Sequence, residues 1–200
     1  MPSTLVATQT EISGGQPRKH WTRSELKAIS EAGLLNIEKW ELIEGDLIEK
    51  MGKKRPHSIG LWLLLKYLLE VFSIDFIQQE VPIDVRPQDN PTSEPEPDII
   101  VLTAPVTTFT TNNPRPSDIR LVCEVSDSTL AFDLTTKAHL YARAGILEYW
   151  VLDIVGTRLI AHRTPSPEGY QSIQAYAPTE TLAPLSAPAS SVTVSQFFNA

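Results

Sequence analysis

Apolar residues recur along this chain with two spacings, one typical of helices and one typical of strands. Residues 56–72 carry leucines at helical spacing, with further apolar residues around the circumference, which predicts a largely buried helix. Residues 40–50 alternate apolar and polar positions on both sides of Glu44-Gly45-Asp46, which predicts a β-hairpin. Alternating or continuous apolar runs predict the remaining strands, at 76–85, 98–102, 119–126, 148–155, 157–163 and 170–176.

Two further helices are indicated by their end signals. Thr22 or Ser24 can cap a helix over 24–33, which Gly33 would end. A second helix lies within 127–146 and is expected to end near Gly145, because glycine accepts the left-handed backbone at a helix end.

The order of these elements predicts an α/β protein. The helix within 127–146 joins two apolar strands, and such a connection is normally a right-handed crossover between parallel strands. The sheet should therefore be mixed, with helices on its faces. Residues 1–19 are polar and are expected to form a flexible tail, and residues 20–200 are expected to form one domain.

Composition narrows the class of protein. With 42% hydrophobic and 20% charged residues, the chain can bury a core of ordinary size. The single cysteine excludes an internal disulfide and favours a cytoplasmic location. The longest apolar stretch is interrupted by Lys66 and Glu70, which argues against a membrane span. A net charge of −7 argues against a wholly basic nucleic-acid-binding surface, although Lys50, Lys53, Lys54 and Arg55 form a local basic patch that could also be a plain solvated loop.

Glu124 is the residue that the pattern of the strand at 119–126 does not explain. A carboxylate within this apolar run is costly unless it is paired or binds an ion. Asp98 opens another apolar strand directly after Pro97. If the two strands are neighbours, both carboxylates can converge at one end of the sheet, where a divalent cation such as Mg²⁺ would relieve their repulsion.

Lys137 offers a third charged group, with two alternative interpretations. Asp133 and Lys137 are four residues apart, so they could form an exposed ion pair on one helix face. Alternatively, Lys137 reaches back over the carboxylates and stabilises negative charge there.

These motifs resemble the PD…(D/E)xK signature of restriction-endonuclease-like nucleases, through Pro97-Asp98 and Glu124-Val125-Ser126. The block 124–153 is more specifically similar to the Uma-two family of that superfamily, and the similarity covers roughly residues 20–198. One departure is that Ser126 stands where the signature has lysine, and Lys137 on the following helix matches the lysine position of this family. The resemblance implies a restriction-endonuclease-like core of helix, three strands, helix and strand, with an N-terminal hairpin and extra C-terminal strands.

The resemblance also implies an activity and roles for these residues. Asp98, Glu124 and the backbone carbonyl of Val125 would hold Mg²⁺, or alternatively Mn²⁺, and Lys137 would position water and steady the phosphate. The reaction would be hydrolysis of phosphodiester bonds, with DNA as substrate and a homodimer as the working form. Further candidates for the site are Glu41, His57, Ser126, Asp133 and Tyr141, and candidates for phosphate binding are Lys53, Lys54 and Arg55.

Two alternatives stay open from the sequence. The fold could be kept by a catalytically inactive binding or regulatory module, because the lysine within the strand is missing and the chain is acidic. An active enzyme could instead cut RNA, or branched or single-stranded DNA. No helix-turn-helix or zinc-finger pattern indicates how a base sequence would be read.

Overall fold

A computed structural model describes residues 18–50, 52 and 54–198 of the chain. Most of the tail predicted for residues 1–19 lies outside the described residues, as does Lys53. Within the described ranges, no helix has the length and apolar character that crossing a membrane requires.

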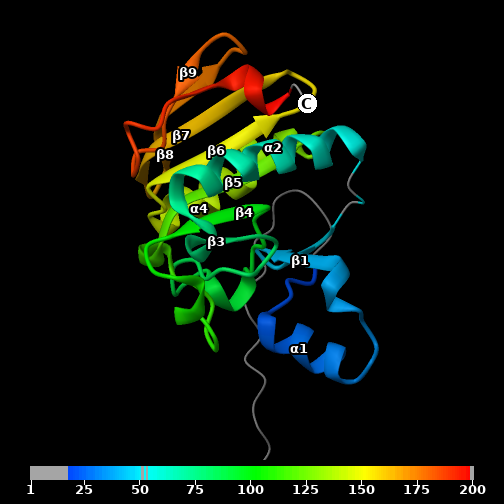
Figure 1. The fold of residues 1–200 in the computed structure, drawn as a ribbon. Helices are drawn as coiled ribbons and strands as arrows, with labels where there is room; N and C mark the ends of the chain where they lie inside the picture. The colour runs from blue at the N-terminus through cyan, green and yellow to red at the C-terminus, as the bar shows by residue number, and fades with distance from the viewer. Residues whose placement is uncertain (1–17, 51, 53, 199–200) are drawn as a thin grey trace, which may run out of the picture.

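The centre of the structure is a mixed six-stranded sheet in the order β3-β4-β5-β6-β7-β8 (Figure 1). Only β5 and β6 run parallel, and every other neighbouring pair in this sheet is antiparallel. The helical segment between β5 and β6 is therefore the predicted crossover, and the mixed α/β class is confirmed. The strands are β3 Ile77–Gln78, β4 Ile99–Leu102, β5 Ile119–Ser126, β6 Glu148–Asp153, β7 Arg158–Ser166 and β8 Gly169–Tyr176.

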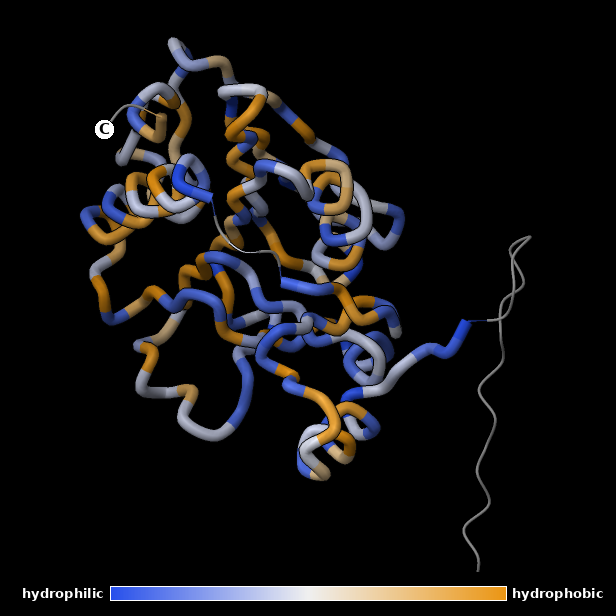
Figure 2. Tube along the Cα trace, turned by 90° about the vertical axis from the view of Figure 1, so that its right-hand side faces the viewer, coloured by the Kyte–Doolittle hydropathy of each residue, from blue (hydrophilic) through white to orange (hydrophobic). Residues whose placement is uncertain are grey.

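Helices cover both faces of this sheet, and the sheet separates the hydrophobic core into two clusters. Helix α2, Arg55–Phe72, packs its leucines against the face that includes Cys123 and Val125. The other face includes Val122 and is covered by the crossover segment. The trace coloured by hydropathy shows hydrophobic and hydrophilic positions alternating along the helices, as expected of elements with one buried side (Figure 2).

The crossover is not one regular helix. It consists of α3 Leu130–Phe132, a π-helical turn Asp133–Lys137 and α4 Ala138–Ala144, which ends at Gly145 in the left-handed conformation. Single π turns inside helices are frequent at functional sites because the extra residue re-aims side chains.

The hairpin and the first helix form a smaller unit below the sheet in Figure 1. Strands β1 Trp40–Ile43 and β2 Asp46–Glu49 form the predicted hairpin, and α1 Arg23–Glu31 begins with a capping box of Thr22 and Glu25. Ile43 anchors the hairpin on α4 through a small apolar cluster.

The C-terminal segment completes the core on the α2 side. Strands β9 Thr181–Leu182 and β10 Val192–Thr193 form a short antiparallel pair. The turn that follows buries Phe197 against α2, with its ring edge on to Tyr67 at 5.8 Å between centroids.

The prediction of a strand over 76–85 is wrong beyond its first residues. Glu80 has a positive φ of 52° and Pro82 has no N–H to donate to a ladder. The N–H groups of Glu80 and Ile83 donate instead to the carbonyls of Pro97 and Pro95. The segment is thus held by a neighbouring loop rather than by a strand.

The prediction that the helix at 56–72 is largely buried is also only half right. Five of its residues are buried, and Trp62 is 57% exposed on its outer side. Nothing among the described elements packs over that side, so apolar content alone overstated its burial.

A buried carboxylate at the start of β6 shows how this fold satisfies a structural charge. Glu148 is fully buried and accepts hydrogen bonds from both Nε and Nη2 of Arg163, from Trp150 Nε1 and from the Leu185 N–H. Such complete satisfaction offsets the desolvation of the charge.

His162 in β7 makes the stability of the fold sensitive to acid. Its buried ring contacts the rings of Tyr149 and Tyr170, and its Nδ1 has no hydrogen-bond partner among the described residues. Burial lowers the pKa of His162 from 6.5 to about 4. The unfolded chain therefore binds this proton more tightly than the folded chain does, so acid favours unfolding.

We predict that this contribution to the free energy of unfolding is intact above pH 6.5. It should be lost progressively between pH 6.5 and 4, by up to roughly 3 kcal/mol. Urea denaturation at several pH values should show the wild type losing stability relative to His162→Phe as pH falls. Substitution of the exposed His139 should produce no such slope, and a difference between wild type and His162→Phe that is independent of pH would contradict the prediction.

Candidate active site

Glu124 lies near the end of the central strand β5, on the face that the crossover covers. It is 5% exposed, and its neighbours Cys123 and Val125 point to the opposite face, as strand alternation requires. The sheet therefore buries this carboxylate between itself and the π-helical turn.

Asp98 meets Glu124 from the adjoining antiparallel strand. The pairing of Ile99 with Cys123 places Asp98 beside Glu124, one position beyond the last ladder pair. The Asp98 N–H donates to Glu124 Oε2 at 3.4 Å, and the Val125 N–H donates to Asp98 Oδ2 at 2.8 Å. The two acids predicted to converge thus lie side by side at one end of the sheet.

Lys137 reaches back over these carboxylates from the π-helical turn. Its Nζ lies 2.8 Å from Glu124 Oε1, and the hydroxyl of Tyr141 donates to the same oxygen at 3.2 Å. Lys137 is 6% exposed and Asp133 is 3% exposed. The alternative of an exposed ion pair between these two residues is therefore wrong.

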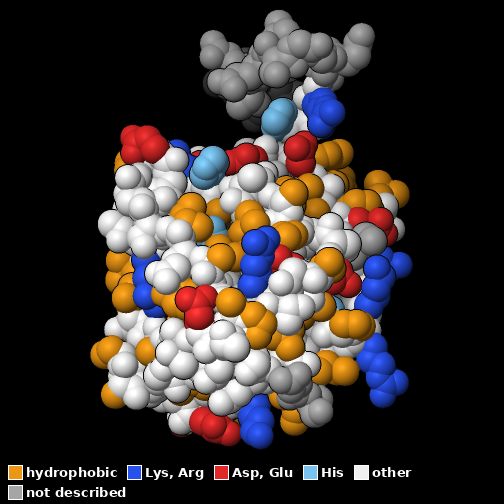
Figure 3. All heavy atoms as spheres, turned by 90° about the horizontal axis from the view of Figure 1, so that it is seen from above, with side chains coloured by type: hydrophobic (Ala, Val, Ile, Leu, Met, Phe, Trp, Pro, Cys, Tyr) orange, Lys and Arg blue, Asp and Glu red, His pale blue; other side chains and the backbone are white. Residues whose placement is uncertain are grey.

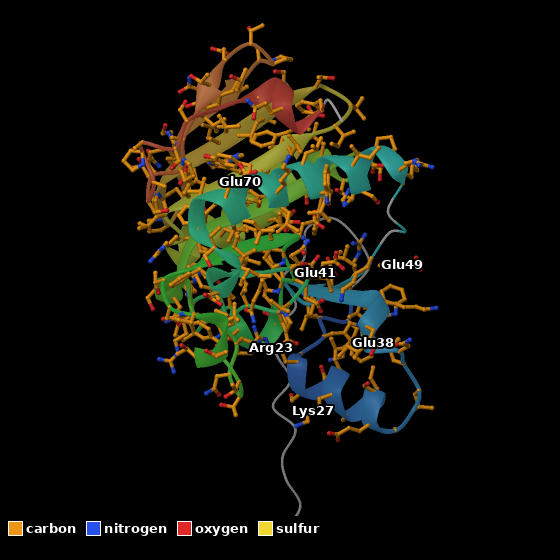
Figure 4. The ribbon with its side chains drawn as sticks, in the orientation of Figure 1. Arg23, Lys27, Glu38, Glu41, Glu49 and Glu70 are labelled. Carbon is orange, nitrogen blue, oxygen red and sulfur yellow. The ribbon has the colours of Figure 1, made fainter. Side chains whose placement is uncertain are left out.

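Glu41 joins the cluster from the hairpin. Its Oε1 lies 3.1 Å from Lys137 Nζ and accepts the Glu96 N–H at 2.7 Å. Figure 4 shows Glu41 at the boundary between the hairpin and the sheet. Lys137 is consequently held between two carboxylates from different parts of the fold, and an ammonium has a third N–H to offer.

The charges in this cluster are strongly coupled. Burial raises the pKa of Glu124, the charge of Lys137 opposes this, and the neighbouring carboxylate of Asp98 adds to the rise. Burial acts to lower the pKa of Lys137, but Glu124 and Glu41 outweigh it and hold the pKa well above its usual value. Lys137 therefore stays an ammonium, and three described carboxylates, those of Glu124, Glu41 and Asp133, act to raise its pKa.

Asp133 and Ser126 lie in a second network beside this cluster. Thr129 Oγ1 donates to Asp133 Oδ2 at 2.7 Å and lies 3.3 Å from Ser126 Oγ. The hydroxyl of Tyr149 donates to the Asp133 carbonyl at 3.1 Å. These contacts fix the π-helical turn from which Lys137 projects. Sequence reasoning missed Thr129, whose only signal is its position four residues before Asp133.

A cleft of about 750 Å³ opens over the acids, between the hairpin and the end of the sheet. Its lining includes Asp98, Glu124, Lys137 and His57. His57 stands in the first turn of α2, and its Nε2 lies 3.7 Å from Asp98 Oδ1. Small molecules and short polymer segments occupy protein clefts of this size.

The predicted basic patch only partly faces the cleft. Lys50 lines it but is paired with Glu96. Lys54 and Arg55 are exposed where α2 begins, and Lys53 lies outside the described residues. Seen from above, lysine and arginine side chains gather along the right-hand edge, the side on which α2 begins in Figure 1 (Figure 3).

The donor groups of the site fit a hydrated divalent cation better than a tightly caged one. Within the described ranges, no three His, Cys, Asp or Glu side chains are arranged as a ready metal cage. Mg²⁺ commonly takes one or two protein carboxylates and completes its shell with water and phosphate. Asp98 and Glu124 supply two carboxylates that repel each other, and such a pair suits that coordination.

The buried ion network around Lys137 leads to a prediction about stability. Lys137→Met should lower the free energy of unfolding by about 3 kcal/mol, because Glu124 and Glu41 then lose a buried partner. Lys27→Met is the matched control, since Lys27 and Glu31 form an exposed pair at 3.9 Å that contributes at most about 0.5 kcal/mol. Equal stability of the two variants in urea denaturation would show that Lys137 is not part of a buried network.

Comparison with known proteins agrees with this fold. The Uma2 family model, described as "Putative restriction endonuclease", matches residues 29–195. A crystal structure of a "putative nuclease belonging to DUF820" from Anabaena variabilis ATCC 29413 superposes with a TM-score of 0.63. It is 15% identical, and the match covers 84% of this chain and 94% of that one, so the likeness concerns the fold. No curated protein matches the chain. Because the family model spans most of its length, this chain belongs to the Uma2 family.

Proposed function

We propose that this protein is a divalent-metal-dependent nuclease that hydrolyses phosphodiester bonds in DNA. The observation that carries the proposal is the meeting of three groups in one buried cluster. Asp98 and Glu124 come from adjoining strands, and Lys137 comes from the crossover that follows. Membership of a family described as "Putative restriction endonuclease" supports the same reaction class.

Asp98 and Glu124 would hold Mg²⁺ or Mn²⁺, with the carbonyl of Val125 as a further ligand. A bound divalent ion supplies charge stabilisation to the phosphate and lowers the pKa of coordinated water. The protein's own contribution is rigidity. The Val125 N–H fixes Asp98, while Lys137 and Tyr141 fix Glu124 Oε1. Both carboxylates are thus oriented before any ligand arrives.

Lys137 would stabilise the negative charge that builds up on the phosphate. Two of its N–H donors are directed at Glu124 and Glu41, which orient the third. Because its pKa is held well above its usual value, the amine stays charged at neutral pH. Lys137, on the crossover, thereby supplies the positive charge that Ser126, at the lysine position of the signature in β5, lacks.

The nucleic acid would approach along the side where α2 begins. Lys54 and Arg55 are exposed there and can contact backbone phosphates. The described part of the basic patch offers only these few phosphate contacts, so binding should weaken only modestly as salt rises. A homodimer would let two such sites cut both strands.

A second candidate function is a metal-binding or regulatory module without catalysis. It is favoured by the full engagement of Lys137 with two buried carboxylates, an arrangement that can be purely structural. This candidate keeps the fold but predicts no cleavage by the wild type.

Plasmid cleavage with Mg²⁺ or Mn²⁺ tests the proposal. Wild type should nick or linearise the plasmid, and Asp98→Asn and Lys137→Met should each lower the rate by about 100-fold or more, because each removes a charge that acts at the phosphate. Glu70→Gln, on the exposed side of α2, should cleave like wild type. Cleavage that survives both site substitutions would point to a different site and overturn the proposal.

A further inference from the structure

The proposed catalytic groups lie deep in a cleft of limited size. Glu124, Lys137 and Asp98 are 5%, 6% and 9% exposed. The cleft over them has a volume of about 750 Å³, which suits a ligand of drug size. Duplex DNA, whose major groove alone is about 12 Å wide, is too bulky to enter it. A scissile phosphate therefore reaches these groups most directly on a strand that has left its partner.

The charge of the cleft disfavours a duplex further. Among the described residues, ten acidic side chains and two lysines line it. Burial raises the pKa of three of these acids, and the other seven still outnumber the lysines. Both lysines are already paired, Lys50 with Glu96 and Lys137 with Glu41 and Glu124. Duplex DNA carries one charge per about 1.7 Å of its axis and a single strand about half as many, so this lining repels a single strand less.

An aromatic side chain offers an unpaired base a favourable contact in this cleft. Trp40 lines the cleft and is partly exposed. It belongs to none of the three hydrophobic clusters that the described residues form, so its ring is not committed to the core. Bases stack on aromatic rings whatever their sequence, because every base has a π face. Such stacking is open to a base of a single strand, whereas the bases of a duplex are already stacked on one another.

Trp40 lies next to the catalytic cluster in the chain and in the cleft. It directly precedes Glu41, whose carboxylate lies 3.1 Å from Lys137 Nζ. Trp40 also pairs with Glu49 at the end of the hairpin away from its turn. Successive side chains of a strand point to opposite faces, yet Trp40 and Glu41 both line the cleft. The cleft therefore passes around this open end of the hairpin and connects the indole ring with the cluster.

We propose that the substrate of this site is an unpaired strand of DNA, and that a base near the scissile phosphate stacks on Trp40. This inference rests on the proposed function and names its substrate class. Trp40 binds the substrate and selects unpaired DNA, whereas Asp98, Glu124 and Lys137 act at the phosphate. A supercoiled plasmid opens transiently into unpaired stretches, so it remains a substrate and should be nicked there first.

The first test measures binding and does not depend on turnover. Fluorescence anisotropy with Mn²⁺ compares a labelled single-stranded oligonucleotide with the fully paired duplex of the same sequence, both with phosphorothioate linkages that slow hydrolysis. The single strand should bind wild type at least about 10-fold more tightly than the duplex, as the loss of one base-stacking contact implies. Equal affinity for the two, tighter binding of the duplex, or no binding of the single strand would overturn the inference.

The second test assigns the stacking to one ring. Trp40→Leu keeps an apolar side chain in β1 but removes the ring face, so KM and Kd for the single strand should rise by about 10-fold while kcat stays near the wild-type value. Trp40→Phe restores a ring and should recover most of the loss. Trp62→Leu is the matched control, since Trp62 is 57% exposed on the outer side of α2, and it should behave like wild type. An unchanged KM in Trp40→Leu, or an equal loss in Trp62→Leu, would contradict the role of Trp40.

The outcomes distinguish the two proposals. If wild type cleaves a linear duplex as fast as the single strand, the substrate class is wrong and the nuclease assignment stands. If wild type cleaves neither DNA with either metal, the proposed function itself fails, and with it the substrate class.

Discussion

The structure depends on a carboxylate placed where a strand would ordinarily put an apolar side chain. Glu124 is buried on both sides, by the sheet and by the π-helical turn, and its charge must be compensated there. Lys137 supplies one positive charge, but Asp98 and Glu41 add two more carboxylates to the same space. Buried carboxylates that crowd together in this way are costly unless further positive charge compensates them, and a divalent cation can supply such charge.

The contrast with Glu148 shows that this arrangement is not the only one available to the fold. Glu148 is also buried, but Arg163, Trp150 and a backbone N–H satisfy it with four hydrogen bonds. Glu124 instead shares its cation with Glu41 and faces a cleft. The contacts of Glu148 compensate a buried charge for structural purposes, whereas the arrangement around Glu124 leaves its charge available to a ligand.

Much of this could be predicted from sequence because the determining signals are local. Alternation along 119–126 assigned Glu124 to the opposite face from Cys123, and the proline before Asp98 marked a strand start. The π-helical turn could not be predicted, since helical periodicity assumes a regular spacing and one extra residue changes which side chains are buried. The failure over 76–85 has a similar origin, because the backbone partners of that segment lie in a distant loop. The role of Glu41 also depended on contacts between the hairpin and the crossover, which no short window of sequence contains.

The most direct measurement of the central claim is calorimetric titration of the protein with Mn²⁺ and Mg²⁺. The account predicts saturable binding of a divalent ion by wild type and by the exposed control Glu70→Gln, and loss of that binding in Glu124→Gln and in Asp98→Asn. Absence of binding in wild type, or binding that is unchanged in both site variants, would contradict it.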